Sequence, residues 1–145
     1  LEIVEKISSE CDKDSRIKRS FRSRTRDFAT SIYINGVAYT VSVAAARSTA
    51  ASIELGLQMQ KLDDLPRLCK DPNFARSLGL EKPEDYGYAL YGASLLYILK
   101  ALGIISSSKL SDALKELLGN VVANKTAFQA ATWLKRFAEA YIYEG

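Results

Sequence analysis

Residues 31–43 decide the fold class, because they fit either a β-hairpin or a helix. The stretch reads SIYINGVAYTVSV, and Asn35-Gly36 between β-branched flanks is a strong hairpin signal, since a type I′ turn needs positive φ at both central residues. The apolar side chains also recur at helical intervals, and the residues that follow are rich in alanine and other strong helix formers. A lone hairpin is marginally stable, and the sequence offers no third strand. We therefore predict that Asn35-Gly36 lies within a helix or between two helices.

The rest of the chain also has helical periodicity, interrupted by one connector. Ile17, Phe21 and Phe28 recur on one face of a helix that begins near Ser15. All three prolines lie in residues 61–85, which we expect to form a connector with at most short helical turns. Further helices are predicted over residues 1–12, 84–105 and 110–118, and from near Asn124 or Thr126 to residue 143. The pattern predicts an all-α fold, one compact domain over residues 1–145 with about five or six helices.

Residues 86–105 are long and apolar enough to raise the alternative of a membrane span. They read YGYALYGASLLYILKALGII and hold a single charge, at Lys100. Gly87 and Gly92 dilute the hydrophobicity, tyrosines lie within the run, and no other segment resembles it. A helix buried on most sides in a protein core is the favoured interpretation, and we expect no contact with a membrane.

The sequence contains no histidine. This absence excludes Ser-His-Asp and Cys-His nucleophile systems and histidine-ligated zinc or haem, and it removes the most common general base near neutral pH. Gly-rich phosphate loops and metal-ligand spacings are also missing. We therefore expect a protein that is not an enzyme and that uses no cofactor or metal.

The two cysteines, Cys11 and Cys69, are far apart and have no CxxC or other ligand spacing around them. We expect reduced thiols, and a single disulfide is the less favoured alternative, because it is more typical of smaller secreted domains. The chain starts LEIVEK without a signal peptide, which favours a cytoplasmic location.

A basic run is the most unusual feature of the chain. The segment SRIKRSFRSRTRDF carries six cations, whereas the whole chain has a net charge of only +3. These residues are Arg16, Lys18, Arg19, Arg22, Arg24 and Arg26. On a helix, Arg19, Arg22 and Arg26 form a stripe opposite the apolar face, with Lys18 beside it and Arg24 nearer the apolar edge. Arginine suits bidentate phosphate contacts, and only Asp27 adjoins the run, so local salt bridges should not neutralise it.

The basic run has three interpretations. A solvated basic face is the simplest, and docking on an acidic protein partner is the second. Binding to nucleic acid phosphates is the third and the one we favour.

Aromatic residues and a second pair of cations give weaker signals. Tyrosines such as Tyr33 and Tyr39 could stack on bases, although tyrosines at helical spacing more often belong to a core or an interface. Trp133 is expected to anchor the last helix, while Lys135 and Arg136 point outward. We include Lys135 and Arg136 among the candidate nucleic-acid-binding residues.

Two separated motifs stand out in the chain. The first reads SRTRDFATSIYINGVAYTVSVAAARS, in which a basic and apolar start leads to Asn35-Gly36 and an apolar helical run. The second reads TAFQAATWLKRFAEAYI. Together they cover about a third of the residues, and they resemble the small subunit of type III-B CRISPR effector (Cmr) complexes, whose last helix is similar to the second motif.

The resemblance implies a role in antiviral defence. Members of this family are small all-α subunits that stack along the inner side of the ribonucleoprotein, beside the backbone subunits that hold the guide RNA, and they are not nucleases. The expected partners are therefore other CRISPR effector subunits and guide and target RNA, with possible self-stacking. The alternative is a helical protein–protein adaptor that docks its basic helix on an acidic partner without nucleic acid.

Overall fold

Helices form all the regular secondary structure in the part of the chain that the computed structural model describes, residues 1–11 and 14–142. In chain order they are α1 Glu2–Glu10, α2 Ser15–Asn35, α3 Val37–Arg47, α4 Ala50–Gln58, the 3₁₀ turn η1 Leu62–Asp64, α5 Arg67–Lys70, α6 Pro72–Ser77, α7 Pro83–Ala101, α8 Leu110–Leu117 and α9 Val121–Tyr141. The prediction of an all-α fold is confirmed. The predicted number of five or six was too low, since these residues contain nine α-helices. The connector supplies two of the extra ones, the short helices α5 and α6.

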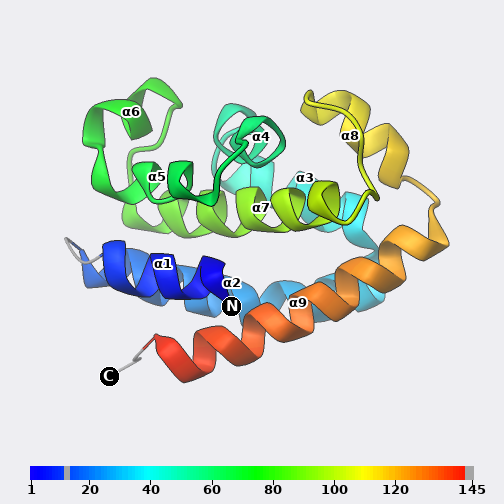
Figure 1. Ribbon diagram of the computed structural model, residues 1–145, viewed down its shortest axis with the longest axis horizontal. Helices are drawn as coiled ribbons and strands as arrows, with labels where there is room; N and C mark the ends of the chain where they lie inside the picture. The colour runs from blue at the N-terminus through cyan, green and yellow to red at the C-terminus, as the bar shows by residue number, and fades with distance from the viewer. Residues whose placement is uncertain (12–13, 143–145) are drawn as a thin grey trace.

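Helix α7 is the centre of the molecule. It runs across the middle of Figure 1, with α4, α5 and α6 on one side and α1, α2 and α9 on the other. Most of its side chains are buried, and its glycines allow close helix contacts. A Cβ on Gly92 would overlap Ile53 of α4, and a Cβ on Gly87 would overlap Ser20 of α2. The interpretation of this segment as a buried helix is confirmed. Within the described ranges, none of the helices has the length and hydropathy needed to span a bilayer.

The Asn35-Gly36 pair lies between two helices, which is one of the two helical arrangements that the sequence allowed. Asn35 is the last residue of α2, and Gly36 has a φ of 88°, which favours glycine and breaks the helix. The Gly36 N–H still donates to the carbonyl of Ile32 at 2.9 Å, and the Val37 N–H donates to Oδ1 of Asn124 in α9 at 2.9 Å. Burial of Ile32 and Val37 against other helices outweighs the β propensity of this stretch.

Several helix starts differ from the sequence-based expectation. The N-cap of α2 is Asp14 rather than Ser15, since the Asp14 side chain accepts from the Arg16 N–H. Helix α9 begins at Val121, earlier than predicted, because the Asn120 side chain accepts from the Ala123 N–H at 3.0 Å and caps it. Leu118, expected on the inner face after α8, is instead exposed.

The expectation of reduced thiols was wrong. Cys11, at the end of α1, forms a disulfide with Cys69 of α5, and both residues are buried. An ion pair between Lys70 and Glu10 at 2.9 Å joins the same two elements. The connector folds back over α1, and this long-range contact brings together two cysteines that are 58 residues apart.

Candidate nucleic-acid interface and apolar groove

Helix α2 is buried on its inner face and carries the basic run on its other faces. Its inner side chains Phe21, Phe28 and Ile32 are buried, and the rings of Phe28 and Tyr91 of α7 meet edge to face with centroids 5.1 Å apart. Helix α2 packs against both α7 and α9, so its orientation is fixed by two neighbours. The remaining faces of α2 therefore carry the cations toward solvent.

The six cations of α2 differ in exposure. Arg16, Arg19 and Arg26 are exposed, and Arg22 is half-buried, so the predicted stripe is present with one partly covered member. Lys18 is half-buried and its Nζ donates to the carbonyl of Ser8 at 3.2 Å, which ties α2 to α1. Lys18, one of the candidate nucleic-acid-binding residues, therefore has a structural contact with α1.

Two of the cations form local ion pairs, contrary to the sequence-based expectation. Asp14 accepts hydrogen bonds from Nε and Nη2 of Arg16 at 3.1 and 2.9 Å. These hydrogen bonds lower the pKa of the Asp14 carboxyl and raise the pKa of Arg16. Asp14 was overlooked in the sequence because it precedes the run and also serves as a helix cap.

Arg24 is half-buried, with 19% of its side chain exposed. Its Nη2 lies 3.4 Å from Oδ2 of Asp27, and its guanidinium lies 4.5 Å from the ring centroid of Tyr88. This position agrees with the predicted location near the apolar edge. Arg24 therefore covers one face of the Tyr88 ring.

A polar cleft of about 800 Å³ lies between the first half of α2 and the start of α7. Arg16, Arg19 and Arg24 line its α2 side, and Lys82 and Glu84 line its α7 side. We call it the α2–α7 cleft. Sequence reasoning did not nominate Lys82, because this lysine belongs to the proline-containing connector, 63 positions after Arg19. Only the fold places the two cations beside one cleft.

The cations of α9 lie apart from this cleft. Lys135 is half-buried, and exposed Arg136 has its Nη1 3.8 Å from Oε1 of Glu139 one turn later. Trp133 does not anchor the helix as expected. It is 63% exposed and stacks on Phe137 with ring centroids 5.4 Å apart.

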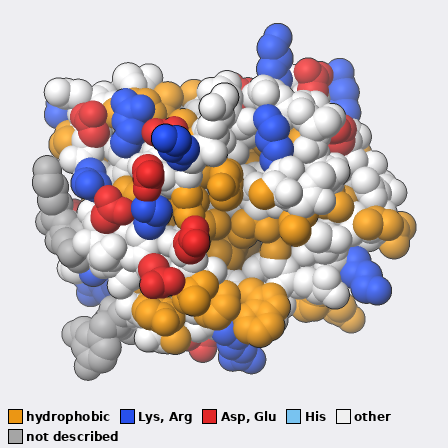
Figure 2. Space-filling model, in the orientation of Figure 1, with side chains coloured by type: hydrophobic (Ala, Val, Ile, Leu, Met, Phe, Trp, Pro, Cys, Tyr) orange, Lys and Arg blue, Asp and Glu red, His pale blue; other side chains and the backbone are white. Residues whose placement is uncertain are grey.

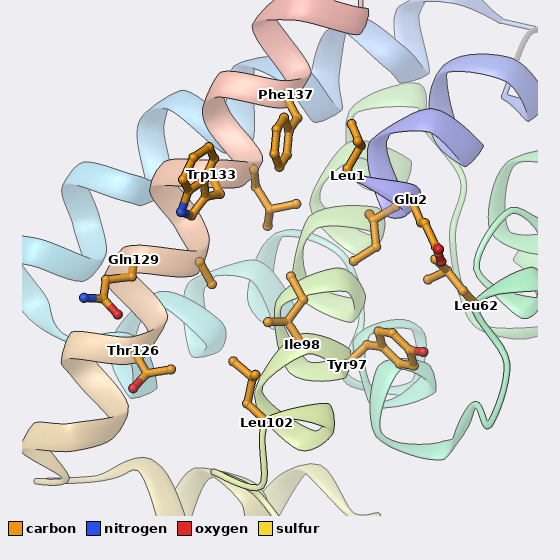
Figure 3. A pocket seen from close by; sticks show the side chains of 13 residues that line it. Leu1, Glu2, Leu62, Tyr97, Ile98, Leu102, Thr126, Gln129, Trp133 and Phe137 are labelled. Carbon is orange, nitrogen blue, oxygen red and sulfur yellow. The ribbon is translucent and has the colours of Figure 1, made fainter.

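Trp133 and Phe137 form one wall of an apolar groove of about 510 Å³ (Figure 3). Ile98, Leu102 and Tyr97 of α7 form the opposite wall, and Leu1 lies at the end nearest Phe137. Figure 2 shows hydrophobic side chains gathered over the space between α7 and α9, with acidic and basic side chains toward α1. Exposed apolar surface of this extent, with a polar rim, is typical of protein–protein interfaces.

Comparison with known families decides the identity of this fold. The model of the family described as CRISPR-associated protein (Cas_Cmr5) matches residues 1–141. The chain belongs to the Cas_Cmr5 family. A search of curated proteins and a search of solved structures returned no match.

Membership of the Cas_Cmr5 family confirms the resemblance drawn from the two sequence motifs and makes the chain a subunit of a type III-B CRISPR (Cmr) complex. It also implies association with other Cmr subunits. The matched region contains both surfaces described above, the basic face of α2 with the α2–α7 cleft and the apolar groove between α7 and α9.

Proposed function

We propose that this Cas_Cmr5 subunit is non-catalytic and contacts guide or target RNA phosphates through α2. The observation that carries the proposal is the concentration of cations on the outer faces of one helix, in a chain whose net charge is only +3. Arg16, Arg19 and Arg26 are exposed there, and the buried inner face of α2 holds them in place. Phosphate contacts of this kind supply affinity without sequence preference.

The chemistry of the chain supports a non-catalytic role. There is no histidine to act as a general base. Tyr91 is buried, which raises the pKa of its phenol and removes it as an acid–base group near neutral pH. The positioning of RNA within a ribonucleoprotein needs neither acid–base nor nucleophilic groups.

The apolar groove supports a role in assembly. A chain in a complex needs surfaces that pack on other subunits, and the groove lined by Trp133, Phe137 and Leu102 is suited to that purpose. We assign it to contact with a neighbouring subunit, either a backbone subunit or a second copy of this chain. We place the assembly in the cytoplasm, where guide and target RNA meet.

The RNA contact is tested by fluorescence anisotropy with a labelled single-stranded RNA at several salt concentrations. If Arg16, Arg19, Arg22 and Arg26 each contact a phosphate, the slope of log K against log salt should be about −3, from about 0.7 per contact on single strands. Replacement of Arg19, Arg22 and Arg26 by alanine should make the slope shallower by about 2 and weaken binding to all RNA sequences alike.

The matched control removes three charges elsewhere, as the Lys109→Ala, Lys115→Ala, Lys125→Ala variant. All three lysines are exposed: Lys109 precedes the first residue of α8, Lys115 lies in α8 and Lys125 lies in α9. Equal loss of affinity in both triple variants would show that net charge alone, and not the face of α2, attracts RNA.

The adaptor alternative is separated by affinity purification of the tagged chain from its native cells. Recovery of Cmr subunits together with short guide RNAs is expected. Recovery of one acidic protein and no RNA would favour the adaptor. The same conclusion would follow if added RNA does not compete with the binding of this chain to that protein.

A further inference from the structure

The walls of the α2–α7 cleft are fixed relative to one another. Helices α2 and α7 cross where Ser20 meets Gly87, so closely that a Cβ on Gly87 would overlap the serine. The Ser20 hydroxyl also lies 3.4 Å from the carbonyl oxygen of Glu84, at the start of α7. Because Pro83 restrains the backbone at that point, Lys82 and Arg19 are presented at a spacing set by packed helices.

The cleft has an excess of positive charge. Four cations line it, namely Arg16, Arg19, Arg24 and Lys82, and Glu84 is the carboxylate on its lining. Arg16 and Arg24 are paired with Asp14 and Asp27, respectively. Among residues 1–11 and 14–142, Arg19 and Lys82 form no ion pair. Cations presented by two elements beside one open space repel each other, and a bound anion would remove that repulsion.

The lining also indicates the chemistry of the anion. Guanidinium and ammonium groups and the hydroxyl of Ser23 are suited to phosphate oxygens. None of the described residues that line the cleft is aromatic, so its lining offers no stacking platform for a base. These groups can bind a phosphate without reading the base attached to it.

We infer that the α2–α7 cleft seats backbone phosphates of an RNA strand, with Arg19 and Lys82 as ligands from opposite walls. This inference rests on the proposed function and assigns its principal phosphate site. It adds Lys82, which does not belong to the basic run, as a phosphate ligand. It also predicts that the cations on the cleft side of α2 contribute more to RNA affinity than the cations of α9. Base identity should have no effect on affinity at this site.

The test measures binding of a fluorescein-labelled oligouridine RNA to the full chain and to Arg19→Gln, Lys82→Gln and the double variant. Each single variant should weaken binding about fivefold and make the salt slope shallower by about 0.7. The double variant should lose less than the product of the two single losses, because both side chains bind the same phosphate segment. The control Lys115→Gln removes one exposed charge from α8, at the other end of α7 in Figure 1, and should leave affinity unchanged.

Several outcomes would overturn the assignment of RNA phosphates to the α2–α7 cleft. If Lys82→Gln behaves as Lys115→Gln while Arg26→Gln weakens binding, the exposed stripe binds RNA and the proposed function stands without the cleft. Absence of any salt-dependent RNA binding by the unsubstituted chain would overturn both. Displacement of the RNA by inorganic pyrophosphate at equal concentration would show that the cleft takes small phosphate compounds. Thermal melting of each variant verifies that the fold is retained.

Discussion

Reduction of the Cys11–Cys69 disulfide should lower the free energy of unfolding substantially. The bond closes a loop of 58 residues, and the loop-closure entropy that it removes from the unfolded chain corresponds to about 4 kcal/mol at 25 °C. A loss of that size should lower the melting temperature by roughly 10–15 °C for a chain of this length. It is a large fraction of the roughly 5–15 kcal/mol by which folded proteins are stable.

The assay is urea unfolding of the oxidised chain and of the chain passed through the unfolded state with a thiol reductant, because both cysteines are buried in the folded protein. The Cys11→Ala, Cys69→Ala variant is the control, since the reductant should not change its midpoint. Thiol titration under denaturing conditions counts the free cysteines in each sample. If the oxidised sample has no free thiols and reduction still changes the free energy of unfolding by less than about 1 kcal/mol, the loop-entropy reasoning is refuted.

Three further predictions concern packing, capping and pH. Gly56→Ala should destabilise the fold by about 3 kcal/mol in urea unfolding, because the new Cβ would overlap the carbonyl oxygen of Ala93 in α7. The control Ala51→Gly, at an exposed site of α4, should cost about 1 kcal/mol or less. Equal losses of stability in the two variants would contradict the overlap. Asn124→Ala should cost about 1 kcal/mol by removing the acceptor for the Val37 N–H, and Asn73→Ala, at an exposed position, is the comparison. Hydrogen bonds from the hydroxyls and N–H groups of Ser106 and Ser107 lower the pKa of Glu116 from 4.5 to about 2, so the stability that Glu116 contributes is complete above pH 4.5 and is lost as the pH falls toward 2. Between pH 6 and pH 2, the melting temperature should therefore fall less steeply for Glu116→Gln than for the unsubstituted chain. Parallel curves would contradict this assignment.

Helical periodicity was enough to predict the fold class and most helices. The helical phase of the apolar residues on both sides of Gly36 favoured helix over hairpin, but it left open whether the glycine lies within a helix or between two helices, and the structure shows that it separates α2 from α3. The last helix was started too late because Asn120, a short polar residue after Gly119, was not recognised as its cap. Prediction failed where an outcome depended on which elements pack together.

The same limit applies to the candidate site. The exposed arginines of α2 could be found because they lie close together in sequence and the inner face of their helix is apolar. Lys82 could not, since its position beside Arg19 follows from the crossing of α2 and α7 at Ser20 and Gly87. The Cys11–Cys69 pairing was hidden for the same reason. Trp133 was expected to anchor the last helix, and its exposure depends on how α9 packs beside α7.

The bond between Val37 and Asn124 also bears on the order in which the chain can fold. Helix α3 has its first amide satisfied by a side chain 87 positions later, so its N-terminus is completed only when α9 docks. During synthesis, α2, α3 and α7 leave the ribosome before α9, so the Val37 N–H gains its native acceptor only when the last helix docks.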